Sequence, residues 1–184
     1  RARDVRAAAH AQATEVAIMA DLQGPKIRIG KFADGRVTLE AGQAFVLDAE
    51  CALGDATRVG LDYPELPRDV GRGAILLLDD GLIRLSVEQV DGPRITTRVE
   101  VGGVLSNNKG INRQGGGLSA PALTAKDMDD VKTAVEIGAD YLAVSFPKSR
   151  EDMYMARQLL RAAGGRAQLV AKIERAEAIL ALEE

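Results

Sequence analysis

The stretch TAKDMDDVKTAVEIGADYLAVSFPKSREDMYMARQLLRAAGGRAQLVAKIE, residues 124–174, decides the fold class. Thr124 and Asp127 have the spacing of a capping box, which predicts a helix that Gly138 ends. A strand, a second helix and another strand should follow, because short apolar runs alternate here with helical periodicity. The two predicted strands cover residues 141–145 and 168–174. This succession is typical of parallel strands joined by crossover helices.

The beginning of the chain follows the same pattern. An alanine- and arginine-rich segment over residues 1–14 predicts a helix, and residues 15–21 predict a buried strand that ends on Asp21. Gly24-Pro25 then interrupts the pattern. We therefore assign these first residues to the same α/β domain as the later stretch.

Between about residues 26 and 112 the helical periodicity disappears. Apolar and polar side chains alternate with period two, which indicates strands with one buried and one wet face. Two hairpins are predicted, one turning at Asp91-Gly92 and one at Asp34-Gly35, which would join 27–29 to 37–39. Several short strands with glycine turns indicate a small antiparallel barrel or sandwich.

The sequence thus predicts an α/β domain that an all-β module interrupts. We expect the α/β domain to hold residues 1–24 and 121–184, and the inserted module to hold residues 25–120. A complete eight-stranded β/α barrel needs about 250 residues, so the 184 residues present are too few for one.

Composition excludes several classes of function. A formal net charge of -3 gives no reason to expect nucleic acid or an anionic membrane as partner. No apolar run approaches the roughly 20 residues of a membrane span. The single cysteine, Cys51, cannot form an intramolecular disulfide and fits a reducing compartment. The single histidine, His10, argues against histidine-rich metal sites and Ser-His or Cys-His mechanisms.

Polar residues follow three predicted strands of the α/β domain, where ligands bind in such folds. They are Asp21, Ser145 and the pair Lys172 and Glu174. The members of that pair are two residues apart, so on a strand both side chains would point to one face. A carboxylate that holds Mg²⁺ beside a lysine that neutralises an anion would suit metal-assisted group transfer. A structural ion pair explains the same spacing, and both interpretations stay open at this point.

The two ends of the inserted module carry cations. Arg28 could bind a phosphate through its guanidinium fork, and Lys109 lies in a polar segment from which it could reach an anion. Solvated charges in a hinge and in a loop are the alternative interpretation. Asp79 and Asp80 could ligate a metal, although a hairpin turn accounts for them equally well.

Six segments, taken together and in order, resemble the pyruvate kinase family over essentially the whole chain. Each segment alone is a weak signal, but their order and the module boundaries match the family. The resemblance implies an α/β fold, namely a partial (β/α)8 barrel of about three strands with helices, interrupted by a small antiparallel all-β lid barrel. The segments are Asp21–Arg28, Asp79–Ile83, Asn108–Asn112, Leu123–Asp127, Val144–Phe146 and Ala171–Glu174.

The resemblance implies the glycolytic transfer of a phosphoryl group from phosphoenolpyruvate to ADP, which gives pyruvate and ATP. By the matching positions, Lys172 would be the catalytic residue and would stabilise the transferring group and the developing enolate. Glu174 would ligate Mg²⁺ or Mn²⁺. Arg28 and Lys109 would bind the nucleotide phosphates, and Asp80 would be a further lid contact. The resemblance also implies a cytoplasmic homotetramer, with neither nucleic acid nor membrane as partner.

The resemblance also bears on a monovalent cation. Many members of the family bind K⁺, partly through the aspartate at position 21 and the backbone carbonyl at position 22. Those members commonly have Thr at position 22 and Glu at position 26, where this chain has Leu22 and Lys26. This combination resembles the K⁺-independent branch, and a lysine ammonium can supply the monovalent charge. We therefore expect K⁺ to be dispensable, with Asp21 and Leu22 still at the cation position.

The resemblance further implies that the chain is an internal part of a longer protein. A segment that binds phosphate should precede Arg1, and a second Mg²⁺ carboxylate should follow Glu184. A single carboxylate is a poor Mg²⁺ site. We therefore expect the 184 residues alone to have little or no activity.

Two other interpretations remain at the level of sequence. The β module could be a non-catalytic binding module with the α/β part as its scaffold, and Arg28 and Lys172 on opposite surfaces would favour that interpretation. Another barrel enzyme that uses phosphoenolpyruvate is the second alternative, although such enzymes do not share this insertion with its two hinge segments.

Overall fold

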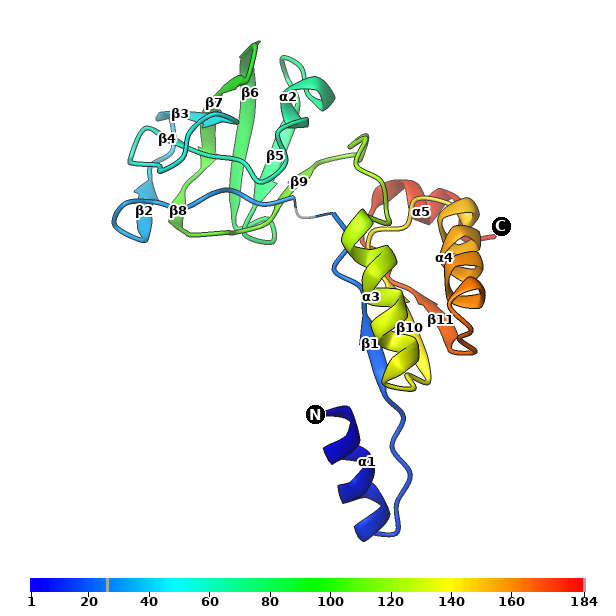
Figure 1. The fold of residues 1–184 in the computed structure, drawn as a ribbon. Coiled ribbons are helices and arrows are strands. Elements are labelled where there is room, and N and C mark those ends of the chain that lie inside the picture. The colour runs from blue at the N-terminus through cyan, green and yellow to red at the C-terminus, as the bar shows by residue number, and fades with distance from the viewer. Residues whose placement is uncertain (26, 184) are drawn as a thin grey trace. The chain divides into compact units, whose positions relative to one another are not determined.

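The computed structural model describes residues 1–25 and 27–183 of the chain, and Lys26 and Glu184 lie outside the described residues. The chain forms two compact units (Figure 1). The first, here called the α/β unit, comprises Arg1–Pro25 and Pro121–Glu184. The second, the β unit, comprises Lys26–Ala120. Each unit has an apolar core of its own.

The α/β unit contains a parallel sheet in the strand order β1-β10-β11. Its strands are Met19–Asp21 (β1), Tyr141–Val144 (β10) and Gln168–Ala171 (β11), and its helices are Ala2–Ala11 (α1), Ala125–Glu136 (α3), Arg150–Ala162 (α4) and Ala176–Leu180 (α5). Helix α4 connects β10 to β11, so the predicted parallel strands with a crossover helix are confirmed. Among the described residues these strands form an open sheet and not a closed barrel.

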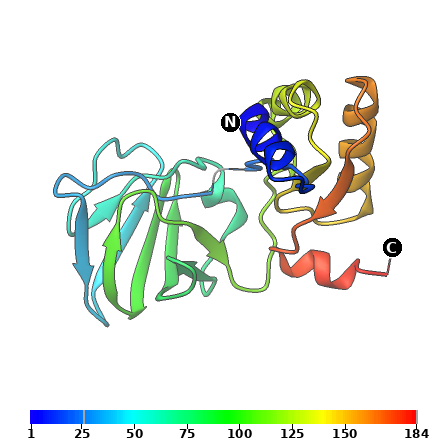
Figure 2. The same cartoon turned by 90° about the horizontal axis from the view of Figure 1, so that it is seen from below.

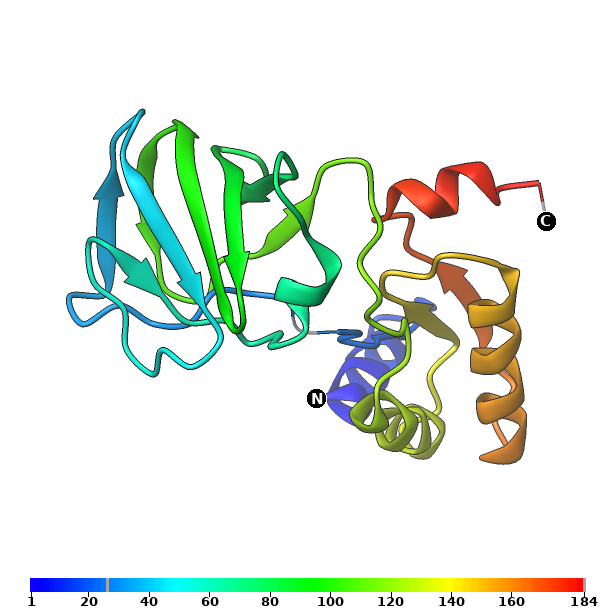
Figure 3. The same cartoon turned by 90° about the horizontal axis from the view of Figure 1, so that it is seen from above.

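Capping residues set the two ends of helix α3. Thr124 and Asp127 form the predicted capping box at the start of α3, and Gly138 follows its end with φ +64. Figure 3 shows α3 and α4 on the same side of the sheet. Val131 of α3 and Leu160 of α4 are buried in the core of this unit. None of the helices in the described part of the chain is long and apolar enough to cross a membrane.

Several predicted elements are shorter than expected, among them β11, which ends at Ala171 instead of residue 174. Helix α1 ends at Ala11, and β1 has three residues instead of the expected 15–21. The reason is the extent of the neighbouring strand, because β1 begins opposite Tyr141, the first residue of β10. None of the three residues of β1 is buried as predicted, because β1 lies at the edge of the sheet. Just before β1, the N–H of Ile18 donates to the side chain of Asp140 at 2.8 Å instead of to a strand.

The β unit contains a two-stranded sheet, β2-β8, and a six-stranded sheet in the order β4-β3-β7-β6-β5-β9. Figure 2 shows its long strands side by side. Their apolar faces form one core, in which Phe45, Leu85 and Ile95 are fully buried. The strands are Arg36–Leu39 (β2), Ala44–Asp48 (β3), Arg58–Val59 (β4), Ile75–Leu78 (β5), Ile83–Asp91 (β6), Arg94–Val101 (β7), Gly103–Ser106 (β8) and Ile111–Arg113 (β9), and the one short helix between them is Leu66–Asp69 (α2).

Of the two predicted hairpins, one is confirmed and one is wrong. Strands β6 and β7 pair antiparallel across the Asp91-Gly92 turn. The hairpin expected at Asp34-Gly35 does not form, because β2 pairs with β8, with Arg36 opposite Ser106. The segment before the turn instead makes isolated bridges, one of which joins Arg28 to Gly110.

The expectation of a wholly antiparallel all-β module needs two corrections. Strands β3 and β4 run parallel, with Val46 opposite Arg58. The intervening loop folds back because the carboxylate of Asp55 accepts hydrogen bonds from the backbone of Thr57 and Arg58. In addition, α2 forms a helical turn, and Pro67 suits its first positions.

Candidate functional site

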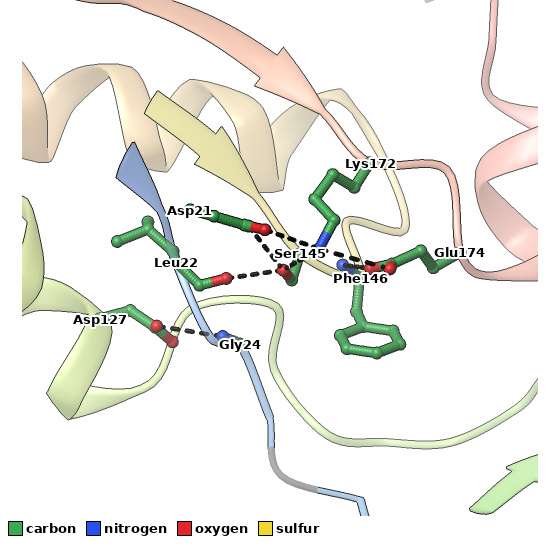
Figure 4. Close-up of polar contacts among 8 residues, drawn as sticks. All are labelled: Asp21, Leu22, Gly24, Asp127, Ser145, Phe146, Lys172 and Glu174. Carbon is green, nitrogen blue, oxygen red and sulfur yellow. Dashed lines mark hydrogen bonds and ion pairs between the residues drawn. The ribbon is translucent and has the colours of Figure 1, made fainter. Parts of the chain in front are cut away.

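The polar residues predicted at strand ends lie together in the α/β unit (Figure 4). Asp21 is the last residue of β1, and Ser145 and Lys172 directly follow β10 and β11. Because the three strands are parallel, their carboxyl ends share one edge of the sheet. The fold therefore brings side chains to one place that are far apart in the sequence.

Lys172 lies at the centre of this cluster. Its Nζ is 3.2 Å from Oδ2 of Asp21 and 3.5 Å from Oε1 of Glu174, and it donates to Oγ of Ser145 at 3.0 Å. Partial burial lowers the pKa of Lys172, because it disfavours the charged form. The hydrogen bond to Asp21 and the negative charge of Glu174 raise it by more, so the pKa of Lys172 lies above its usual value. The lysine therefore presents a permanent cation at neutral pH.

Glu174 reaches the cluster by a route that the sequence pattern did not predict. Strand β11 ends at Ala171, so the alternation of a strand does not govern residues 172 and 174. Instead, Oε2 of Glu174 accepts a hydrogen bond from the backbone N–H of Phe146 at 3.2 Å. Phe146 has φ +58, a conformation that is uncommon for a bulky residue and that concentrates at functional sites. Nothing in the sequence signals it.

Ser145 connects the lysine to the backbone that directly follows β1. Its side chain is buried, and its hydroxyl donates to the carbonyl oxygen of Leu22 at 2.6 Å. The Oγ of Ser145 is also 3.4 Å from Oδ1 of Asp21, a longer contact. The side chain of Leu22 packs in the apolar core, so only its carbonyl faces the cluster.

The oxygen atoms of this cluster suit a hard cation. Asp21 and Glu174 offer carboxylates, Ser145 a hydroxyl and Leu22 a carbonyl, which are ligand types that Mg²⁺ and K⁺ accept. No group of three or more His, Cys, Asp or Glu side chains with metal-binding geometry occurs among the described residues. A divalent ion here would therefore draw its remaining ligands from substrate oxygens and water.

The other predicted site residues belong to the β unit. Arg28 donates from Nη1 to the carbonyl oxygen of Asn108 at 2.9 Å, so the segments that carry Arg28 and Lys109 are neighbours in space. The ammonium of Lys109 is 2.8 Å from Oδ1 of Asp79. Asp79 and Asp80 both have positive φ values, which fits the turn interpretation of this segment. Two basic side chains thus lie on neighbouring segments, one at the start of the β unit and one just before β9.

Comparison with known proteins decides the family. A family model described as pyruvate kinase, barrel domain, matches residues 1–184. The chain belongs to the pyruvate kinase family. It is 55% identical over 181 residues to a pyruvate kinase of Haemophilus influenzae, and 56% identical over 181 residues to pyruvate kinase II of Salmonella typhimurium. A pyruvate kinase of Corynebacterium glutamicum is 38% identical over 179 residues.

The match covers the chain much more fully than it covers those pyruvate kinases. It includes 97% of this chain but 38% of the length of each of the three relatives. Family membership therefore includes both units described above, and the chain spans about 38% of the length of the relatives that it matches.

Proposed function

We propose that the protein of which these residues are part transfers a phosphoryl group from phosphoenolpyruvate to ADP, which gives pyruvate and ATP in glycolysis. The observation that carries this proposal is the position of Lys172, held between the carboxylates of Asp21 and Glu174 at the ends of parallel strands. Phosphoryl transfer needs positioning and charge neutralisation more than covalent catalysis, so a fixed cation suits the reaction.

In this proposal Lys172 is the catalytic residue. Its raised pKa keeps the ammonium charged, so it can neutralise the transferring phosphoryl group and the enolate oxygen that forms. Glu174, which the Phe146 N–H holds in place, would ligate Mg²⁺ or Mn²⁺ together with substrate oxygens. When bound, that ion would neutralise phosphate charge as a Lewis acid.

The β unit would act as a lid over the nucleotide. Arg28 and Lys109 would bind the phosphates of ADP, the first through its guanidinium fork and the second as a point charge. The ion pair between Lys109 and Asp79 would have to open or be shared when an anion binds. Closure of a lid excludes water, whose attack would waste the phosphoryl group.

The finer architectural predictions belong to the same proposal. The three parallel strands would be part of a (β/α)8 barrel, with the β unit inserted after the first of them. A homotetramer in the cytoplasm would be the working form. We further propose that K⁺ is dispensable, because Leu22 and Lys26 replace the residues typical of K⁺-dependent members. Lys26 lies outside the described residues, so this part depends on sequence and on the bonded Leu22 carbonyl.

The test is an assay of the full-length protein for pyruvate formation from phosphoenolpyruvate and ADP, with and without K⁺. We expect turnover that requires Mg²⁺ or Mn²⁺ and that changes less than about twofold when K⁺ replaces a non-activating monovalent cation. A severalfold activation by K⁺ would contradict the second expectation alone. Absence of phosphoryl transfer to ADP, with a partner protein captured by the β unit, would favour the binding-module alternative.

A further inference from the structure

Asp127 is a fully buried carboxylate that is held by hydrogen bonds and forms no salt bridge with any of the described residues. Its Oδ2 accepts hydrogen bonds from the backbone N–H of Thr124 at 2.8 Å and from the hydroxyl of Thr124 at 2.6 Å. A buried carboxylate is costly unless hydrogen bonds satisfy it. The position at the N-terminus of α3 provides some of this stabilisation.

The capping box accounts for only one of the two oxygens of Asp127. The other oxygen, Oδ1, accepts a hydrogen bond at 3.1 Å from the backbone N–H of Gly24, which is 103 positions away in the sequence (Figure 4). Helix capping does not require that bond. The geometry therefore gives Asp127 a second connection, from the start of α3 to the segment that follows β1.

That segment is where the chain leaves the α/β unit, because the β unit begins directly after Pro25. The chain returns at Pro121, three residues before the cap residue Thr124. A single buried carboxylate thus binds the departing connection through Gly24 and the returning connection through Thr124. Both connections of the β unit are fastened to the same point of the α/β unit.

Gly24 in turn packs against the turn that carries the candidate site. It is buried with φ +64, and a Cβ placed on it would lie 3.0 Å from Cβ of Ser145 and 3.2 Å from the Phe146 ring. Ser145 accepts from Lys172, and the N–H of Phe146 holds the carboxylate of Glu174. A shift of Gly24 would therefore displace Ser145 and Phe146, which contact Lys172 and Glu174.

We propose that Asp127 is a positioning residue that fixes Gly24, and through it the hinge of the β unit and the turn that orients the Lys172 and Glu174 side chains. The catalytic consequence of this proposal rests on the proposed function, whereas the structural part does not.

The experiment compares Asp127→Ala with Thr124→Ala in the full-length protein. Both variants break the capping box, but Thr124→Ala leaves Oδ1 of Asp127 free to accept from Gly24. Residue-resolved hydrogen–deuterium exchange should show the Gly24 amide exchanging about tenfold faster or more in Asp127→Ala, and within about twofold of the unaltered protein in Thr124→Ala. Equal exchange rates of the Gly24 amide in the two variants would overturn the proposal.

Kinetics and the unaltered protein complete the test. If the protein transfers phosphoryl groups, Asp127→Ala should lower kcat severalfold while Thr124→Ala does not, and equal kcat values would overturn the catalytic part. If Asp127→Ala does not fold, hydrogen exchange of the Gly24 amide in the unaltered protein tests the hydrogen bond instead. Protection of its Gly24 amide by about 100-fold over an unstructured peptide supports the bond, and an unprotected amide contradicts it. If neither the unaltered protein nor a variant transfers phosphoryl groups, the proposed function is wrong. The exchange rates of the Gly24 amide would still test whether Asp127 positions Gly24.

Discussion

The ammonium of Lys172 lies 3.2 Å from Oδ2 of Asp21, although the two residues are 151 positions apart in the sequence. The contact exists because β1 and β11 are both parallel to β10 and end at the same edge of the sheet. About a third of the lysine side chain remains exposed, so the cation is fixed in place and still accessible to an anion. Several consequences of this arrangement can be measured.

Replacement of Lys172 by Met should remove the cation with little effect on stability, because surface ion pairs contribute about 0–1 kcal/mol. If Lys172 neutralises the transferring group, kcat of the full-length protein should fall by about 10²–10³-fold. The matched control is Lys132→Met, which breaks an ion pair with Asp129 on the exposed face of α3. Similar kcat values for the two variants would rule out a catalytic role for Lys172.

Replacement of Glu174 by Gln keeps an oxygen that can accept from the Phe146 N–H but removes the charge. We expect the affinity for Mn²⁺, measured by electron paramagnetic resonance of the free ion, to fall by about tenfold or more. Glu88→Gln is the control, since Glu88 is a comparably exposed carboxylate that pairs with Arg98 in the β unit. Unchanged Mn²⁺ affinity in Glu174→Gln would exclude Glu174 as a ligand.

The pH dependence of the cluster follows from the raised pKa of Lys172. A group whose pKa is raised by folding stabilises the folded state at pH values below its unfolded pKa, and this contribution disappears as the pH rises through the raised value. The ion pairs of Lys172 should therefore persist through neutral pH and weaken only in the alkaline range, above the ordinary value of 10.5. Replacing Asp21 by Asn should lower the pKa of Lys172, because it removes the hydrogen bond to the carboxylate. Nuclear magnetic resonance titration of the Lys172 side chain measures this, and a higher pKa in the variant would contradict it.

A hydrogen-bonded tyrosine in the β unit should contribute to stability. The hydroxyl of Tyr63 donates to Asp69 at 2.6 Å and contacts Oγ of Ser119 at 3.0 Å. Burial and the carboxylate of Asp69 raise the pKa of Tyr63, so the hydroxyl keeps its proton. Tyr63→Phe should lower the free energy of unfolding by about 1 kcal/mol in denaturant titrations. Tyr154→Phe, at a side chain that is 63% exposed, should change it by less than about 0.5 kcal/mol.

Alanine substitutions at two glycines with positive φ, Gly35 and Gly24, should distinguish the cost of backbone strain from the cost of steric crowding. Gly35 has φ +75, and a Cβ added to it would meet no atom within 4 Å, so Gly35→Ala should cost about 1–2 kcal/mol from conformation alone. Gly24→Ala adds a close approach to Ser145 and should cost about 1–3 kcal/mol more. Thermal or chemical unfolding of both variants measures the difference. Equal losses would mean that the turn at Ser145 yields without strain.

Elements that depend on residues close together in the sequence could be predicted, whereas some pairings between distant segments could not. The β6–β7 hairpin and the α3 capping box were predictable because each depends on residues within one turn or loop. The hairpin expected at Asp34-Gly35 failed because β2 finds its partner in β8, and a turn signal contains no information about a competing distant strand.

The same distinction applies to the candidate site. The polar strand ends at Asp21, Ser145 and Lys172 could be placed together because parallel strands impose a common edge. The left-handed backbone of Phe146 and the bond from Gly24 to Asp127 could not, since both arise from packing between segments with no shared local pattern. The functional roles of Asp21, Leu22, Arg28 and Lys109 stay predictions.

The insertion of the β unit also has a consequence for the order of folding. Strand β1 must pair with β10 across the whole insert, and closing a long flexible loop loses entropy that grows with the logarithm of its length. The start of the insert, however, pairs with β9 within the β unit, where the N–H of Ile111 donates to the carbonyl of Ile27 at 3.0 Å. Once the β unit has folded, the loop between β1 and β10 shortens to residues 22–27 and 111–140. Early folding of the insert would therefore accelerate assembly of the sheet that holds the site.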